Sequence, residues 1–432
     1  MSMPERGRPK PEVLAALDAL GVDDHDAKAG RVFSLVFHAG DDVDDIAQRA
    51  HDRYLWHNAL NPGVFPALRT MSSDIVSHAA WLFTGGAVGQ GTDLRAGLAG
   101  FLTSGGTESI LMAVLTAKQQ GLERGVERGN IVLATSAHAA FTKACHYFGL
   151  EERRVPVGDD WRADPDAMAD AGDDDTVLVV ASAPQYPQGV VDPVGAIAAI
   201  AAGHGVNCHV DACMGGLTLP FMERAGLLGE AFEPWDFRVP GVTTISADVH
   251  KYGYVPKGIS VILHRDEASR ARQVFITDGW LGGIYGSSGI LGTKPGGPIA
   301  AGWAVMNYLG VDGFVEKVSL AVAAQRRFVE GVNAIAGLRV VGDPNVTLLA
   351  IGADPDAKVP IDPFAVETAL KARGWHLDRQ GPPDSIHATV TPIQGMDGCR
   401  IIEDVLADFR AVAAEVGTSV AADRSAVYGA TE

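Results

Sequence analysis

Residues 176–212 read TVLVVASAPQYPQGVVDPVGAIAAIAAGHGVNCHVDA, and this stretch decides the fold class. A β-branched run at 176–182 and an apolar run at 207–212 enclose an Ala-rich amphipathic stretch at 193–203. Short apolar runs on either side of a helical stretch are typical of a strand–helix–strand unit, whose two strands lie parallel in one sheet. The sequence therefore predicts an α/β domain with a mainly parallel sheet.

The same alternation continues on both sides of this unit, from about residue 103 to 265. It predicts further strands at 131–135, 243–249 and 258–264, and further helices at 107–120, 139–149 and 164–171. Sheets of this kind bind ligands beyond the carboxyl ends of their strands. A functional site is therefore expected at that edge.

The chain is long enough for two hydrophobic cores. We predict an N-terminal segment (1–60), a large domain (61–297), a small C-terminal α+β domain (298–417) and a polar tail (418–432) with one turn able to dock. The small domain is expected to hold helices at 298–309 and 316–336 and strands at 338–342, 346–352 and 387–392.

Composition narrows the range of partners and compartments. A formal net charge of -18 argues against a general affinity for nucleic acids or anionic membranes, because both need a basic surface. Four irregularly spaced cysteines indicate no disulfide framework, and the N-terminus lacks the apolar stretch of a signal peptide. We expect a cytoplasmic protein without a membrane span that acts on a small molecule.

A glycine-rich turn, Ser104-Gly105-Gly106-Thr107, leads directly into a helical run. Backbone N–H groups and the positive end of the helix dipole suit a phosphate there, and the hydroxyls of Ser104 and Thr107 can add donors. By itself the turn is equally compatible with an ordinary helix N-cap.

Two polar residues follow predicted strands at the same edge. Asp211 ends the strand at 207–212, where a carboxylate can keep a pyridinium nitrogen protonated or simply cap a turn. His138 follows the strand at 131–135, where it can stack on a planar ring or act as a cap. A metal site built from Cys208, His209, Asp211 and Cys213 is disfavoured, because strand alternation points Cys208 away from His209 and Asp211.

The loop Ser246–Gly258, SADVHKYGYVPKG, lies between two predicted strands. Its aromatic and glycine residues are unlike a solvated surface tract. We expect Lys251 to be partly desolvated and held near a cationic partner, so that its pKa is lowered and it can form a Schiff base. Lys257 is the weaker alternative.

Taken together, these motifs resemble the sphingosine-1-phosphate lyase branch of the group II pyridoxal-dependent decarboxylase family, of fold type I. The segments that carry the resemblance are SGGTESI (104–110), HVDACMGG (209–216), ISADVHKYGYVPKG (245–258), GGIYGSSGILGTKPGG (282–297) and NPGVFPALRTM (61–71). The resemblance covers residues 30–310 well and the C-terminal domain in outline. It implies a large domain with a seven-stranded sheet.

The resemblance also implies a pyridoxal 5'-phosphate site and assigns its residues. Lys251 would form the Schiff base, Asp211 would contact the pyridine nitrogen, and His138 would stack on the ring. The phosphate would lie on Ser104, Gly105, Gly106 and Thr107, with Ser182 and His250 also near the cofactor. Tyr285 and Ser287 would reach the neighbouring subunit's cofactor in a homodimer with shared sites.

Three positions depart from the family where it is associated with binding a substrate phosphate. A family tyrosine is here Phe37, a histidine is Asn61, and an arginine is Lys294, which lacks the forked guanidinium. Asn58 and Lys294 can compensate in part. The departures predict a substrate other than a phosphorylated long-chain base.

The predicted activity is retro-aldol cleavage of a 3-hydroxy amine or amino acid, with amino-acid decarboxylation as the alternative. A third hypothesis is a non-catalytic protein that keeps the fold. Proton transfer could fall to Lys251, His250, Tyr254 or Lys257, which the sequence does not rank.

Overall fold

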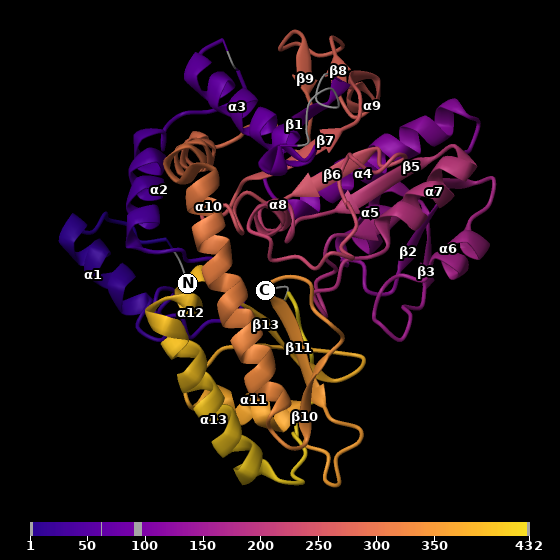
Figure 1. Ribbon diagram of the computed structural model, residues 1–432. Helices are drawn as coiled ribbons and strands as arrows, with labels where there is room; N and C mark the ends of the chain where they lie inside the picture. Colours follow the sequence, from indigo (N-terminus) through magenta and orange to yellow (C-terminus); the bar gives the residue numbers. More distant parts are fainter. Residues whose placement is uncertain (1–2, 62, 90–96, 430–432) are drawn as a thin grey trace.

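A seven-stranded sheet forms the centre of the larger part of the molecule in the computed structural model, which describes residues 3–61, 63–89 and 97–429 (Figure 1). Its strand order is β1-β7-β6-β5-β4-β2-β3. All neighbours pair in parallel except β7, which is antiparallel to both β1 and β6. The strands are β1 (Ala99–Thr103), β2 (Asn130–Ala134), β3 (Glu151–Val155), β4 (Thr176–Ser182), β5 (Asn207–Asp211), β6 (Thr244–Ala247) and β7 (Ser260–His264). The predicted α/β class is confirmed.

Helices cover both faces of this sheet, as strand alternation requires. Ile131 and Leu133 of β2 pack with α4 (Gly106–Glu123) and α5 (Ala140–Phe148) on one face. Val132 and Val179 face the opposite core, which includes α7 (Val194–His204) and α8 (Leu219–Arg224). Two shorter helices, α6 (Pro165–Ala171) and α9 (Glu267–Ala271), complete this part, together with the 3-10 turn η1 (Gly86–Val88).

Two strands of the large sheet were not among the individual strands predicted from sequence. Strand β3 has the sequence EERRV and lies at the sheet edge, where its charged side chains form ion pairs, including Arg153 with Asp173. Strand β1 has the sequence AGFLT and forms the opposite edge. Edge strands need only part of the apolar pattern of a buried strand, so their sequences carry a weaker signal.

One long helix, α10 (Gly296–Asn333), connects the two cores (Figure 1). The sequence predicted two helices here, and the structure instead has one element with a kink at Gly310, whose φ is 54°. Val305 and Val318 of α10 pack in the core of the large sheet, whereas Phe328 and Val332 pack in the second core. The helices α2 (Asp41–Arg53) and α3 (Pro66–Leu82) lie against it.

The second core belongs to a four-stranded antiparallel sheet with the order β10-β11-β13-β12. Trp375, Phe409 and Phe328 are buried there. Phe33 of the N-terminal segment joins them, and its carbonyl oxygen accepts a hydrogen bond from Thr389 N. Its elements are β10 (Leu338–Val341), β11 (Leu348–Ala353), α11 (Pro363–Ala372), β12 (Asp378–Gln380), β13 (Ser385–Thr389), α12 (Pro392–Gly395), η3 (Asp397–Cys399) and α13 (Arg400–Val416).

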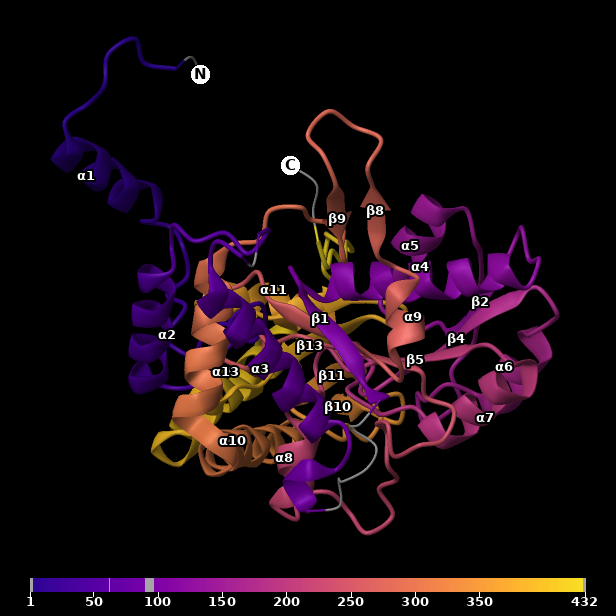
Figure 2. The same cartoon turned by 90° about the horizontal axis from the view of Figure 1, so that it is seen from above.

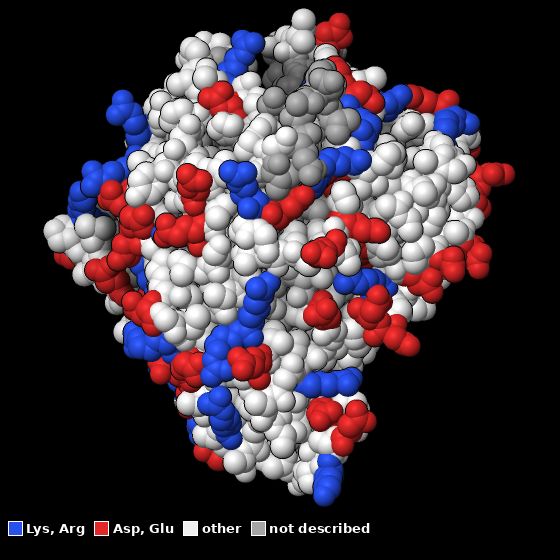
Figure 3. Space-filling view, viewed as in Figure 1, with Lys and Arg blue, Asp and Glu red and all other residues white. Residues whose placement is uncertain are grey.

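Two segments stand out from the body of the molecule (Figure 2). Helix α1 (Lys10–Leu20) has no buried residue and extends away from the rest. The hairpin of β8 (Phe275–Thr277) and β9 (Tyr285–Ser287) projects beside the large sheet. On the face in Figure 3, acidic and basic side chains are interspersed. Within the described ranges, the helices are too short or too polar to cross a membrane.

Candidate active site

A cavity of about 360 Å³ lies at the carboxyl ends of the parallel strands, where the sequence predicted a site. The turns after β1, β2, β5 and β6 all reach this edge, because these strands run in the same direction. The structure thus brings together the glycine-rich turn, His138, Asp211 and Lys251, which are far apart in the sequence. The lining residues are Ser104, Gly105, Gly106, Thr107, Glu108, Ile110, His138, Asp211, Cys213, Asp248, His250, Lys251 and Tyr428.

Helix α4 begins at Gly106 and points its N-terminus at the cavity. A Cβ atom on Gly106 would lie 2.8 Å from the Cys213 sulfur and 2.9 Å from an Asp248 carboxylate oxygen, so only glycine lets the β1–α4 turn approach the neighbouring loops this closely. The free N–H groups at the start of the helix, with its dipole, suit an anion.

The hydroxyl of Ser104 does not have the role that the sequence suggested. Both its backbone N–H and its hydroxyl donate to one oxygen of Glu108, each at 2.7 Å. A hydroxyl has a single proton, so this one is not available to a phosphate. The other Glu108 oxygen accepts from Ile290 N at 2.8 Å. Glu108 therefore ties the turn to the segment that follows β9.

The charged group that pairs with Lys251 is an anion, whereas the sequence predicted a cationic partner. Its Nζ lies 2.9 Å from Oδ2 of Asp248, which is buried. Burial alone would lower the pKa of Lys251, but the Asp248 charge outweighs it and raises this pKa. The prediction of a lowered pKa is wrong, because the partner of Lys251 is a carboxylate and not a cation.

Lys257 is the lysine of this loop whose pKa is lowered, to about 8. Burial is the largest cause, and the positive charge of Lys251 adds to it. Its Nζ donates to the carbonyl oxygen of His250 at 3.0 Å and lies 4.4 Å from the ring centroid of Phe37. Lys257 is therefore suited to exchange a proton near neutral pH.

Asp211 and His138 occupy the positions at the cavity that the sequence predicted. Asp211 is buried at the end of β5, and its Oδ1 accepts from Cys213 N at 3.0 Å and from the Ser246 hydroxyl at 3.4 Å. His138 Nδ1 accepts from Ala140 N at 3.0 Å, and burial lowers the pKa of His138. The lowered pKa favours the neutral form of the His138 imidazole.

His250 also lines the cavity, directly before Lys251. Its Nδ1 accepts from Ile259 N at 3.2 Å, and its Nε2 lies 3.7 Å from a carboxylate oxygen of Asp248. Burial lowers the pKa of His250 despite this carboxylate. Ser182 is buried on β4 beside Asp211 in the sheet register, yet it is absent from the lining of the cavity.

Tyr254 is not at the cavity. It is buried in the core of the large sheet, its ring stacks on Phe314 at 6.0 Å between centroids, and burial raises its pKa well above the usual value. A polar side chain three residues after Lys251 does not reach the cavity here: Tyr254 has a left-handed backbone with φ 57°, and its side chain lies in the core. The position of Tyr254 in the core therefore excludes it from proton transfer at this cavity.

Residues expected at a substrate phosphate or a second subunit lie outside this cavity lining. Asn58 and Asn61 accept backbone N–H bonds at 2.9 Å from Leu60 and Gly63, as turn residues do. Lys294 Nζ donates to the carbonyl oxygen of Leu102 at 3.0 Å. Tyr285 and Ser287 are on β9 of the projecting hairpin, and Phe37 lies beside Lys257 and Tyr252.

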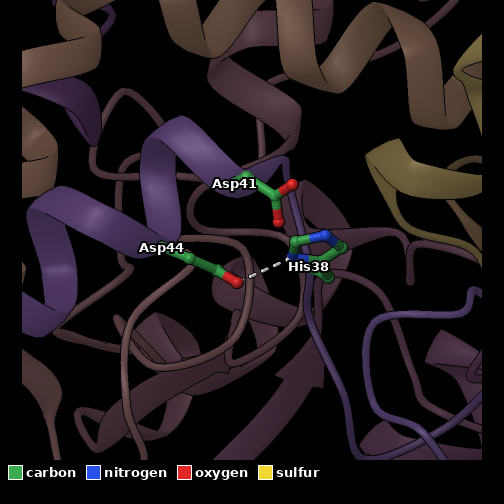
Figure 4. A group of neighbouring side chains, drawn as sticks. All are labelled: His38, Asp41 and Asp44. Atoms are coloured by element: carbon green, nitrogen blue, oxygen red, sulfur yellow. Dashed lines mark ion pairs between the residues drawn. The ribbon is translucent and has the colours of Figure 1, made fainter.

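The geometry does not support a metal site built from Cys208, His209, Asp211 and Cys213. His209 shares hydrogen bonds with the hydroxyls of Thr244 at 2.8 Å and Ser246 at 3.1 Å, and burial lowers its pKa to about 4. Among the described residues, the group with metal-like spacing is instead His38, Asp41 and Asp44, on the segment that enters α2 (Figure 4). Lys28 already pairs with Asp44 at 2.6 Å, so this group is explained by ion pairing.

Sequence reasoning missed Glu108, Cys213, Asp248 and Tyr428 as cavity residues. The first three lie inside the motifs that carried the resemblance, so their positions were a usable signal. Tyr428 lies in the tail, about 180 residues beyond Lys251, where the only signal was the expectation of a docking turn.

Comparisons with known proteins identify the family of the chain. Residues 65–352 match the family described as the pyridoxal-dependent decarboxylase conserved domain. The chain is 37% identical over 390 residues to mouse sphingosine-1-phosphate lyase 1, which covers 90% of this chain and 66% of the mouse protein. The chain thus spans just under two thirds of that relative. It is also 33% identical to the Dictyostelium discoideum sphingosine-1-phosphate lyase, over 99% of this chain and 78% of that protein.

Solved structures show the same fold. The Burkholderia pseudomallei sphingosine-1-phosphate lyase superposes with a TM-score of 0.88 and 36% identity, covering 97% of this chain and 93% of that one. Lactobacillus brevis glutamate decarboxylase has a TM-score of 0.82 at 19% identity, over 97% and 95% of the two chains, which indicates shared fold alone. The chain therefore belongs to the pyridoxal-dependent decarboxylase family, in the branch that resembles the sphingosine-1-phosphate lyases.

Proposed function

We propose that this protein is a pyridoxal-phosphate-dependent lyase that cleaves a carbon–carbon bond of a 3-hydroxy amine or amino acid. The observation that carries the proposal is the meeting of four features in one cavity. These are the N-terminus of α4, His138, Asp211 and Lys251. The names of the relatives, sphingosine-1-phosphate lyases, support a retro-aldol cleavage.

Family membership implies pyridoxal phosphate, and the residues of the cavity fit it. The N–H groups of Gly106 and Thr107 at the start of α4 would hold the phosphate. Asp211 would keep the pyridine nitrogen protonated, His138 would face the ring, and Lys251 is the amine that would attach the group. When bound, this cofactor withdraws electrons from the bond that breaks at the amine carbon.

Proton transfer is then the task of the chain's own side chains. Retro-aldol cleavage needs a base that removes the hydroxyl proton of the substrate, and the carbon left behind must receive a proton. Lys257 is a candidate base, because its pKa of about 8 keeps part of it neutral near physiological pH; it lies outside the lining of the cavity and would reach the substrate from its rim. His250 and Lys251 line the cavity itself and stay candidates for the second transfer.

The substrate is proposed to differ from the long-chain base phosphate that the relatives' names imply. Phe37 has no hydroxyl, and Asn61 uses its side-chain oxygen within its own turn. Lys294 is held by a backbone carbonyl, whereas a forked guanidinium could bind a phosphate with two hydrogen bonds. This set is a poor substitute for a phosphate site.

We also propose a homodimer in which the hairpin of β8 and β9 contacts the second subunit. The hairpin exposes large apolar side chains, which are costly to leave in water on a projecting element. Trp280 is 56% exposed, Ile284 81%, and Leu281 is fully exposed. The cytoplasmic location likewise stays a prediction.

Incubation of the holoenzyme with 3-hydroxy amines and with amino acids tests the reaction. Released aldehyde without carbon dioxide supports the lyase, whereas carbon dioxide from amino acids would establish the alternative, a decarboxylase, on the same scaffold. Borohydride should fix the cofactor covalently to Lys251. A Lys251→Ala variant that kept the visible absorption band and full turnover would contradict the assignment and leave a different lysine to explain it.

A further inference from the structure

The tail returns from the end of α13 across the small sheet to the cavity, and its described part ends at residue 429. The carboxylate of Asp362, the N-cap of α11, accepts from Ala421 N at 2.8 Å and from Arg424. Arg424 also pairs with Asp384, and Arg379 donates to the carbonyl oxygen of Asp423 at 2.8 Å. The tail is therefore fastened to the small domain before it reaches the site.

Tyr428 is the tail residue that lines the cavity. Its ring packs edge-on against His138, with centroids 5.4 Å apart, and against Tyr186, at 5.0 Å. Tyr186 in turn stacks on His387 of β13 at 4.0 Å. Tyr428 is 52% exposed, so it lies at the rim of the cavity. It thus joins the small domain to a residue that faces the cofactor site.

Two hydrogen bonds of His138 indicate which ring nitrogen carries the proton and how the ring contacts Tyr428. Nδ1 accepts from Ala140 N, so in the neutral ring the proton is on Nε2. Nε2 lies 3.3 Å from the Tyr428 hydroxyl, which can accept that proton's hydrogen bond. The Nε2–H donor and the Nδ1 lone pair of an imidazole both point outward in the plane of the ring. Together these two hydrogen bonds fix the orientation of the ring.

We propose that Tyr428 is a positioning residue of the cofactor site, which holds the imidazole of His138 in its stacking orientation from the tail of the same chain. The inference rests on the proposed function, since it assumes that His138 faces bound pyridoxal phosphate. It adds a role for the tail, whose sequence gives no hint of a catalytic site.

The test compares Tyr428→Phe with Tyr308→Phe in the full-length protein. Tyr308 is a matched control, because it is also 52% exposed and its hydroxyl bonds to Asp42 on α2 at 3.0 Å. We expect Tyr428→Phe to weaken pyridoxal phosphate binding about fivefold, the scale of one net hydrogen bond, and Tyr308→Phe to leave it unchanged. The visible circular dichroism of the bound cofactor should change in Tyr428→Phe alone.

A double-mutant cycle with His138→Phe separates positioning from general stability. The effect of Tyr428→Phe on cofactor affinity should disappear in the His138→Phe background, because the shared hydrogen bond is already lost. An unchanged affinity and spectrum in Tyr428→Phe, or an undiminished effect in that background, would overturn the inference.

A second variant, Arg424→Gln, addresses the fastening of the tail without touching the site. It should lower cofactor affinity in the same direction as Tyr428→Phe, and unchanged affinity would contradict the role given to the tail. A wild-type protein that binds no pyridoxal phosphate would overturn the proposed function, and this inference with it. Normal cofactor binding by wild type and Tyr428→Phe alike would overturn the inference only.

Discussion

At the scale of single residues, the two lysines of the Ser246–Gly258 loop differ more than their sequence context suggests. Lys251 pairs with Asp248 and is held as an ammonium, whereas the exposed Lys257 packs on the ring of Phe37 and its pKa is lowered. An amine must be neutral to attack an aldehyde. Asp248 therefore opposes the first step of cofactor attachment in the cofactor-free protein.

Asp248→Asn should speed the attachment of added pyridoxal phosphate at neutral pH. The substitution removes the carboxylate that raises the pKa of Lys251, so a larger fraction of this amine is neutral at a given pH. The rate of appearance of the cofactor's visible band, measured against pH, checks this. Asp236→Asn is the control, because Asp236 is a buried aspartate paired with Arg238. Equal rates in wild type and Asp248→Asn would contradict the explanation.

Lys257→Arg should remove a limb from the pH profile of kcat. In wild type, activity is expected to rise with pH toward about 8, because the neutral amine is the proposed base and is formed as pH passes that pKa. Arginine keeps the charge but does not lose its proton. Lys118→Arg is the control, since Lys118 also donates to a backbone carbonyl, that of Phe148 at 2.6 Å. Persistence of the limb in Lys257→Arg would assign it to another group.

At the scale of elements, α10 determines how the two cores are joined. Its residues up to Val322 pack in the core of the large sheet and those from Ala324 onward in the second core, so the kink at Gly310 lies within the part that packs against the large sheet. Gly310 has φ 54° and ψ -167°, a combination that side-chain-bearing residues avoid. The backbone conformation at the kink therefore favours glycine. A Cβ atom added to Gly310 would have no other atom within 4 Å, so steric contact is not the reason.

Gly310→Ala should destabilise the protein by roughly 1 to 3 kcal/mol, through backbone strain alone. Gly203→Ala, in the last turn of α7, is the contrast. There a Cβ also has open space, but the backbone is not in the left-handed region, so alanine should be neutral or stabilising by up to about 1 kcal/mol. Urea unfolding of both variants measures the difference. Similar midpoints would show that the kink relaxes without strain.

At the scale of the whole molecule, two segments reach beyond their own domains. The tail binds the small domain and reaches the cavity with Tyr428, whereas the hairpin of β8 and β9 projects outward with exposed apolar side chains (Figure 2). The tail completes the site from within the chain. The hairpin is proposed to reach a second copy.

Leu281→Asp should weaken the proposed dimer at least about tenfold, because a charge would be placed in an apolar interface without a partner. Light scattering across a concentration series gives the dissociation constant. Leu122→Asp, which changes a 43% exposed leucine on α4, should leave the mass unchanged. A wild-type protein that is monomeric at all concentrations would contradict the dimer, and an unaffected dimer in Leu281→Asp would exclude the hairpin from its interface.

The sequence by itself determined the parallel sheet and the identity of the central site residues. Local patterns suffice for these, since buried strands such as β4 and β5 are continuous apolar runs and the turns that follow them have fixed directions. The sequence therefore predicts Gly106, His138, Asp211 and Lys251 at one edge of the sheet, and in the structure all four line one cavity.

Only the tertiary structure decided which charges meet. The sign of the pKa shift of Lys251 depends on an oxygen of Asp248 at 2.9 Å, the Ser104 hydroxyl is engaged by Glu108, and Tyr254 is turned into the core. Tyr428 reaches His138 across 290 residues of sequence. Electrostatic and hydrogen-bond energies change over distances of a few ångströms, which sequence spacing does not specify, so these contacts follow from the packing of the folded chain.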